Sequence, residues 1–213
     1  MSWQPLLLPR CWGWQLIMTE KLIAGVDEVG RGPLAGPVVA AAVIFHADTG
    51  ITGLDDSKRL SESARVKLDR VIRTNALCFA IGEADVEEID RMNIFQATLL
   101  AMQRAVNKLD VKPSKVLVDG KHVPDLPCCA EAVIGGDGLI PQISAASIIA
   151  KVYRDNIMQE LHSQFPEYGF DRNKGYPTKM HRDALARYGA TRHHRQTFSP
   201  VRQALGITGL RVE

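Results

Sequence analysis

Runs of apolar and β-branched residues predict three strands in the first part of the chain. "LIAGVDEV" covers residues 22–29 and "VVAAAVIF" covers residues 38–45, with the turn-forming "GRGPLAGP" between them. Short apolar runs bounded by glycine and proline are typical of strands, so we expect a β-hairpin here. The segment "LCFAIGEA", residues 77–84, predicts a third strand.

Apolar residues recur at helical spacing in four other segments. We predict helices over 61–74, over 86–109 with a break near Asn93, over 144–165, and over a short final stretch at 197–205. Ser61 is the expected N-cap of the first helix. Ser199 is the expected N-cap of the last, with Pro200 at the first helical position, where proline is favoured.

The segments "SKVLVDG" and "AEAVIGGD" predict two further short strands, which end on Asp119 and Asp137. Three strands in succession, followed by helices that alternate with two more strands, predict an α/β fold with a mixed five-stranded sheet flanked by helices. Asp27, Asp119 and Asp137 then lie at or near strand ends, where open α/β sheets place their sites.

The composition agrees with one soluble domain. The chain has 213 residues, of which 46% are hydrophobic and 23% are charged. No apolar run reaches the roughly 20 residues of a membrane span. Residues 19–213 contain no repeat or linker and are expected to form a single domain with a helical C-terminal part.

Residues 1–18 are expected to be an extension outside the fold, and Met18 is a candidate for the natural start, which a chain beginning at Met18 would test by its activity. Pro9 and Arg10 interrupt the apolar part of this extension, which argues against a signal peptide. The four cysteines show no C-x-x-C spacing, so they indicate neither a zinc site nor a disulfide framework and favour a reducing cytoplasm.

A basic segment lies near the C-terminus. Between residues 171 and 202, eight basic residues stand against two acidic ones, although the formal net charge of the chain is only +2. A solvated helix face accounts for such a cluster, but it also suits contact with a phosphate backbone. The basic residues are Arg172, Lys174, Lys179, Arg182, Arg187, Arg192, Arg195 and Arg202.

The loop of the expected hairpin fits the loose dinucleotide fingerprint G-x-G-x-x-G/A between Gly30 and Ala35. That fingerprint needs a following helix, whose N-terminal amides hold the pyrophosphate, whereas Gly36 and Pro37 lead into a strand. We therefore reject this motif, and the chain has no Walker A sequence.

Asp27 and Glu28 lie inside an apolar run, where an unpaired carboxylate is costly. With Asp119 and Asp137 they form the best candidate site, because hard cations such as Mg²⁺ bind through a few carboxylates. Two such ions can activate a water and stabilise the leaving oxygen when a phosphate ester is cleaved. For Asp119 or Asp137 alone, a solubilising acid at a strand end is the simpler interpretation.

One geometric objection concerns the adjacent acids. Neighbouring residues of a regular strand point to opposite faces, so Asp27 and Glu28 reach one site only if the strand bulges or ends at Glu28. Otherwise Glu28 would contribute through its backbone carbonyl or through a second metal.

Six fragments in order resemble the bacterial ribonuclease HII family, and they lie between Leu22 and Leu205. They are "GVDEVGRGPLAGPVVAAAV", "DSKRLS", "NIFQATLLAM", "VLVDGKHVP", "SAASIIAKVYRD" and "KGYPTKMH". The resemblance implies a ribonuclease H-like fold and an endonuclease that cuts the RNA strand of RNA–DNA hybrids. It also implies cleavage on the 5′ side of ribonucleotides embedded in duplex DNA, leaving a 3′-hydroxyl and a 5′-phosphate, with Mg²⁺ or Mn²⁺ as cofactor.

Matched by position, the resemblance assigns metal-binding and substrate-binding roles. The metal-binding acids are Asp27, Glu28, Asp119 and, as the fourth, Asp137. The loop that contacts the ribose 2′-hydroxyl is Gly30, Arg31 and Gly32, and Tyr176 packs on the neighbouring sugar. The 2′-hydroxyl is what distinguishes RNA from DNA, and glycine amides can approach a sugar closely. An ordinary half-buried aromatic is the alternative for Tyr176.

Five further residues are candidate phosphate contacts. They are Ser57, Lys58, Ser144, Ser147 and Lys151. Ser144 and Ser147 also suit cap and packing roles, and Lys58 also suits a plain surface position. His181, His193 and His194 lack ligand spacing, so we interpret them as basic-surface residues.

The expected partner is an RNA–DNA hybrid or duplex DNA containing ribonucleotides, bound by a cytoplasmic monomer without membrane contact. Two alternatives stay open. A metal-dependent DNA nuclease or resolvase of the same broad fold would cut an all-DNA substrate. A non-catalytic RNA-binding module would bind RNA whether or not Mg²⁺ is present.

Overall fold

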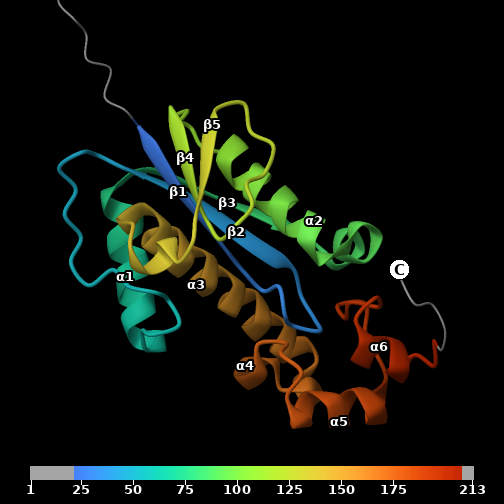
Figure 1. Ribbon diagram of the computed structural model, residues 1–213. Coiled ribbons are helices and arrows are strands. Elements are labelled where there is room, and N and C mark those ends of the chain that lie inside the picture. Colours follow the sequence, from blue (N-terminus) through green and yellow to red (C-terminus); the bar gives the residue numbers. More distant parts are fainter. Residues whose placement is uncertain (1–21, 208–213) are drawn as a thin grey trace, which may run out of the picture.

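A mixed five-stranded sheet lies at the centre of the part of the chain that the computed structural model describes, residues 22–207 (Figure 1). Its strands lie in the order β3-β2-β1-β4-β5. β1 pairs antiparallel with β2, and β2 with β3, whereas β4 is parallel to both β1 and β5. The predicted hairpin and mixed sheet are confirmed. The strands are β1 (Ile23–Val29), β2 (Val38–Phe45), β3 (Ala76–Ala84), β4 (Lys115–Asp119) and β5 (Cys129–Val133).

Three long helices cover the two faces of the sheet (Figure 1). The helix α2 (Val86–Asn107) packs on one face, and α1 (Glu62–Asn75) and α3 (Pro141–Gln164) pack on the other. Ser61 caps α1 as predicted, because its side chain accepts a hydrogen bond from the backbone N–H of Ala64. The predicted break in α2 is confirmed at Asn93, whose φ is 70°.

Strand β2 is buried on both faces, which is why its sequence reads as a continuous apolar run. Ala40 and Ala42 belong to the core under α2, and Val39 and Val43 belong to the core under α1 and α3. Small residues let the helices lie close to the sheet. A Cβ on Gly25 of β1 would overlap the backbone of α3 at its first turn.

Two predicted element boundaries are wrong near the expected site. β5 ends at Val133 instead of Asp137, because Gly135 adopts a left-handed conformation with φ 67° and turns the chain. Asp137 lies in the 3₁₀ turn η1 (Gly136–Gly138). The following helix α3 begins at Pro141, three residues before the predicted start.

The predicted helical C-terminal part is confirmed and lies beyond the far end of α3 (Figure 1). It contains the 3₁₀ turn η2 (Pro166–Tyr168) and the helices α4 (Phe170–Asn173), α5 (Lys179–Tyr188) and α6 (Ser199–Ala204). They enclose a third apolar cluster, which includes Tyr168 and Phe170. The predicted cap of α6 is wrong by one residue, since Phe198 is the N-cap and Ser199 and Pro200 lie in the first turn.

The interpretation of His181 and His194 as basic-surface residues is wrong. Both are fully buried and lie 3.0 Å apart between their Nε2 atoms, and His193 is half-buried. Arg195, counted among the residues of the basic segment, is also fully buried. The basic surface is therefore smaller than the sequence suggested.

Residues 1–18 and Met18 lie outside the described residues. Among residues 22–207, no helix is long and apolar enough to cross a membrane.

Candidate metal centre

Three carboxylates meet at the end of the central strands. Each of Asp27, Asp119 and Asp137 offers an oxygen, and these oxygens lie within 4.8 Å of one another. Parallel pairing explains how Asp27 and Asp119 meet. Val26 lies beside Val118 in the register of β1 and β4, so the next residue of each strand comes to the same edge. Successive side chains of a strand point to opposite faces of the sheet. Because Val26 and Val118 pack under α2, the next residues, Asp27 and Asp119, both point to the face that α3 covers.

The third carboxylate is placed by the turn after β5. The backbone N–H of Gly136 donates to Asp119 Oδ1 at 2.8 Å. Ser144, in the first turns of α3, donates its hydroxyl to the carbonyl oxygens of Asp137 and Ile140. The turn is thus tied to β4 on one side and to α3 on the other, which holds Asp137 beside the two strand-end aspartates.

Glu28 is not one of the three grouped carboxylates, and the strand does not bulge there. The pairing of β1 with β2 continues in regular register through Glu28 and Val29. The side chain therefore lies on the strand face of Val26, and its Oε1 is 3.4 Å from Arg31 Nη1. Burial raises the pKa of Glu28, and the charge of Asp119 adds to this rise. As a metal ligand Glu28 stays a prediction.

The electrostatics of the cluster of Asp27, Asp119 and Asp137 favour a bound cation. Asp27 is only 4% exposed. Burial raises its pKa well above the usual value, and the charges of Glu28 and Asp119 act in the same direction. The pKa of Asp137 is raised by burial and then by Asp119 and Asp56, while Lys58 opposes the rise. Several carboxylates that destabilise each other's ionised forms fit a divalent cation, whose charge would remove the repulsion.

Ser57, Ser147 and Lys58 also lie at this group. The hydroxyls of Ser57 and Ser147 are 2.9 Å apart, and a hydrogen bond from Ser147 lowers the pKa of Asp27. Lys58 Nζ lies 3.8 Å from Asp137 Oδ2, and its side chain is 78% exposed. The loop before α1 thus brings a buried hydroxyl to Ser147, which bonds Asp27, and an accessible ammonium to Asp137.

Lys151 and Ser144 have protein partners already. The ammonium of Lys151 donates to Asp155 Oδ1 at 2.6 Å. Burial lowers the pKa of Lys151, while Asp155 opposes that shift. Ser144 has the cap role described above. Both stay predictions as phosphate contacts.

The hairpin loop and Tyr176 lie together, although they are far apart in sequence. Tyr176 is 43% exposed. A Cβ built on Gly32 would lie 3.4 Å from Tyr176 Cε1, and Arg31 and Gly32 are both exposed. The structure therefore presents the glycine-arginine loop and Tyr176 on a common surface.

Sequence reasoning missed two buried arginines behind this loop. Arg154 is fully buried on α3, and Arg195 follows the buried His194. A signal for Arg154 was present, because it shares a helical stripe with Ala150, Met158 and Leu161, all of them buried. Arg195 had no such signal, since it lies outside any regular element.

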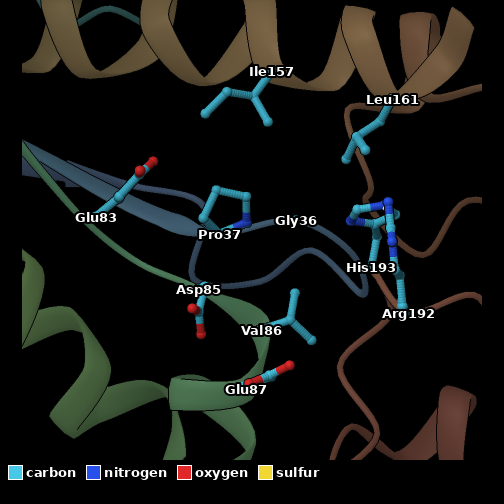
Figure 2. A pocket seen from close by; sticks show the side chains of 10 residues that line it. All are labelled: Gly36, Pro37, Glu83, Asp85, Val86, Glu87, Ile157, Leu161, Arg192 and His193. Atoms are coloured by element: carbon cyan, nitrogen blue, oxygen red, sulfur yellow. The ribbon is translucent and has the colours of Figure 1, made fainter. Parts of the chain in front are cut away.

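A pocket of about 360 Å³ lies on another side of the loop and is not the carboxylate site (Figure 2). In the view of Figure 2, Ile157 and Leu161 of α3 face Asp85, Val86 and Glu87 at the start of α2, with Pro37 between them. The other residues that line it are Gly36, Glu83, Arg192 and His193. None of the predicted site residues lines this pocket.

The sheet and its carboxylates define a ribonuclease H-like nuclease. The crystal structure of a ribonuclease H2 from Pyrococcus horikoshii matches with a TM-score of 0.73 and 28% identity, over 87% of this chain and 98% of that one. Ribonuclease HII of Archaeoglobus fulgidus, solved with PCNA, matches with a TM-score of 0.71 and 26% identity, over 84% of this chain and 95% of that one.

Sequence relatives identify the family within that class. The family model described as Ribonuclease HII matches residues 24–201. Ribonuclease HII of Coxiella burnetii is 58% identical over 85% of this chain and 90% of its own length. Ribonuclease HII of Dechloromonas aromatica is 56% identical over 91% of this chain and 98% of its own length. The chain belongs to the ribonuclease HII family. It is a metal-dependent endonuclease that hydrolyses phosphodiester bonds in the RNA strand of RNA–DNA hybrids, which sets aside both alternatives considered from the sequence.

Proposed function

We propose that the protein cuts the phosphodiester bond on the 5′ side of a ribonucleotide, either in a hybrid or embedded singly in duplex DNA. The active site for this cleavage is the cluster of three carboxylates from Asp27, Asp119 and Asp137. The products are a 3′-hydroxyl and a 5′-phosphate. The observation that supports this proposal is the meeting of three carboxylates within 4.8 Å at the strand ends.

Mg²⁺ or Mn²⁺ is the proposed cofactor, because hard divalent cations bind through carboxylate oxygens. Asp27, Asp119 and Asp137 would hold it, and Glu28, on the other side of Asp27, would serve a second ion. Bound there, such cations supply an activated water and neutralise charge on the phosphate and the leaving oxygen.

The surrounding residues orient these acids and the substrate. Ser147 holds Asp27, and the N–H of Gly136 holds Asp119, so each carboxylate keeps a defined direction. Lys58, exposed beside Asp137, is placed to attract a substrate phosphate. Ser57, Ser144 and Lys151 complete the proposed phosphate-binding set.

Recognition is assigned to the loop and to Tyr176. Gly30, Arg31 and Gly32 present main-chain groups to the ribose 2′-hydroxyl, and the exposed ring of Tyr176 packs on the neighbouring sugar. Their proximity supports a joint role, since a Cβ built on Gly32 would touch the ring of Tyr176.

The test uses duplex DNA that contains one ribonucleotide. The protein is incubated with it in Mg²⁺, in Mn²⁺ and in chelator, and the cut is mapped at single-nucleotide resolution. We expect metal-dependent cleavage 5′ of the ribonucleotide and no cleavage of the matched all-DNA duplex. Asp27→Asn and Asp119→Asn should abolish cleavage, while Asp110→Asn, an exposed acid outside the site, should retain it. Full cleavage by Asp27→Asn or Asp119→Asn would refute the assignment.

The same proposal places the protein in the cytoplasm as a monomer, acting in ribonucleotide excision repair. The small basic surface and the accessible loop support contact with nucleic acid. Size-exclusion chromatography with light scattering tests the monomer, which should show the chain mass of 23.5 kDa, whereas a dimer should show twice that mass.

A further inference from the structure

Two buried arginines bind the back of the glycine-arginine loop. Arg195 donates to the carbonyl oxygen of Gly30 at 2.6 Å, of Arg31 at 2.9 Å and of Gly36 at 2.8 and 3.0 Å. Arg154 donates to the carbonyl oxygens of Ala35 and Pro37 at 2.9 and 3.0 Å. Both side chains are 0% exposed, so the two guanidinium groups act on the main chain from inside the protein.

These bonds set the direction of the loop amides. In a planar trans peptide, the carbonyl of one residue and the N–H of the next point in opposite directions. Since Arg195 turns the carbonyls of Gly30 and Arg31 inward, the N–H groups of Arg31 and Gly32 point away from it. Both residues are exposed, and within residues 22–207 neither amide donates a hydrogen bond to the protein. Two adjacent donors thus face the surface beside Tyr176.

The second arginine also fixes Tyr176 relative to the loop. Arg154 Nη1 donates to the carbonyl of Lys174 at 2.9 Å, and the N–H of Leu34 donates to the carbonyl of Gly175 at 2.7 Å. The loop and the segment before Tyr176 therefore share one guanidinium. Gly30 needs to be glycine for this arrangement, because its φ is +93° and a Cβ would overlap the side chain of Arg154.

The burial of two cations is costly, and Asp155 and Asp90 offset it only from a distance, since each favours the charged form of one arginine without an ion pair. Among the described residues, neither Arg154 nor Arg195 has a carboxylate within 4.0 Å, so carbonyl dipoles supply their hydrogen bonds. Burial lowers the pKa of Arg154 to about 10 and of Arg195 to about 9, which leaves both charged at neutral pH.

We propose that Arg195, together with Arg154, is a positioning residue for substrate recognition: it aims the N–H groups of Arg31 and Gly32 at the ribose. This inference rests on the proposed function of the loop. Arg195 itself, fully buried, does not touch the substrate.

The test replaces Arg195 by lysine, which keeps the charge but cannot match the fork of donors that reaches three carbonyls. For the duplex with one ribonucleotide, we expect kcat/KM to fall by about tenfold or more, since small displacements of positioning groups have large effects on rate. The rise in Tm on adding Mn²⁺ should equal that of the wild type, because the carboxylates are untouched. Arg104→Lys is the matched control. Arg104 also donates to a main-chain carbonyl, that of Glu83, and to the carboxylate of Glu88, but it does not contact the loop. Its replacement should therefore leave kcat/KM within about twofold of the wild-type value.

A double-mutant cycle with Gly32→Ala separates positioning from general destabilisation. If Arg195 acts through the loop, the two substitutions should lower kcat/KM by less than the product of their separate effects. Multiplicative effects, a lost response of Tm to Mn²⁺, or unchanged kcat/KM in Arg195→Lys would each overturn the inference. If circular dichroism shows Arg195→Lys to be unfolded, the same measurements on Arg154→Lys decide. A wild-type protein that failed to cut would instead refute the proposed function.

Discussion

The backbone N–H of Gly136 donates a hydrogen bond of 2.8 Å to the carboxylate of Asp119. This bond fastens the turn after β5 to the end of β4 and brings Asp137 beside Asp27 and Asp119. The turn thereby supplies a third carboxylate that the strands alone do not place. The cost of assembling three acids is visible in the raised pKa values of Asp27 and Asp137.

Asp27→Asn should raise the Tm of the metal-free protein. The pKa of Asp27 is raised in the folded state, so its ionised form destabilises folding at neutral pH, and stability falls as pH rises through that pKa. Asparagine removes the charge at nearly constant volume. Thermal unfolding at pH 7.5 in chelator measures the effect, with roughly 2–4 °C expected per kcal/mol gained.

Added Mn²⁺ should raise the Tm of the wild type and should raise that of Asp27→Asn much less. The exposed Asp110→Asn serves as the control, with a wild-type response to the metal. A lower Tm for Asp27→Asn in chelator would show that Asp27 does not carry the electrostatic cost inferred for it.

The buried histidine pair predicts a loss of stability in acid. His181 Nδ1 lies 3.0 Å from the carbonyl of Tyr176, so it must carry the proton, and His181 Nε2 accepts from His194 Nε2–H. His194 Nδ1 then accepts from the N–H of Thr191 at 3.0 Å. Every bond is satisfied with both rings neutral. Burial and the charge of His181 lower the pKa of His194 to about 3, and burial lowers that of His181.

Because the folded pKa values lie below the unfolded value of about 6.5, this stabilisation is complete above pH 6.5 and is lost as pH falls toward 3. Each histidine contributes a slope of up to about 1.4 kcal/mol per pH unit. The free energy of unfolding, measured with urea at pH 7.5 and at pH 5.5, should fall less between these pH values for His194→Gln than for the wild type. Equal losses would argue against a neutral pair, since the carboxylates are common to both proteins.

Gly25→Ala should disrupt the site through packing. The added Cβ would overlap the backbone of Gln142 and Ile143, so α3 must move away from β1 and carry the turn with Asp137 along. We expect a destabilisation of about 1–3 kcal/mol and a loss of cleavage. Gly50→Ala is the control, because a Cβ there meets nothing within 4 Å. Chemical denaturation of the two variants gives the comparison, and equal stabilities would contradict the close contact.

Tyr176→Ala should impair cleavage at an embedded ribonucleotide more than it impairs folding. Tyr176 is 43% exposed and its ring lies near Gly32, so its removal takes away a surface for the sugar and little core. We expect kcat/KM to fall by about tenfold, in the range of one lost stacking contact. Tyr188→Ala, at an exposed tyrosine of α5, should leave the rate unchanged. An unchanged rate in Tyr176→Ala would remove this residue from the site.

Local sequence patterns were sufficient to predict the strands of the sheet and most of the helices. Strand and helix periodicity, the Ser61 cap and the break at Asn93 depend on residues within a few positions of each other, so a single segment carries the whole signal. The same holds for Asp27 and Glu28, which indicate a candidate site because carboxylates in an apolar run need a partner, whereas Asp119 alone carried no such signal.

Long-range contacts decided the rest. Asp137 reaches the site through a turn instead of a strand, and the continuous register of β1 leaves Glu28 apart from the three grouped acids. Arg195 and His194 looked like surface charges in a basic segment, yet both are buried. The partners of Arg195 are carbonyls of residues 30–36, and main-chain carbonyls occur at every position of a chain. No residue type marks them in advance, so only the folded chain selects which ones a guanidinium binds.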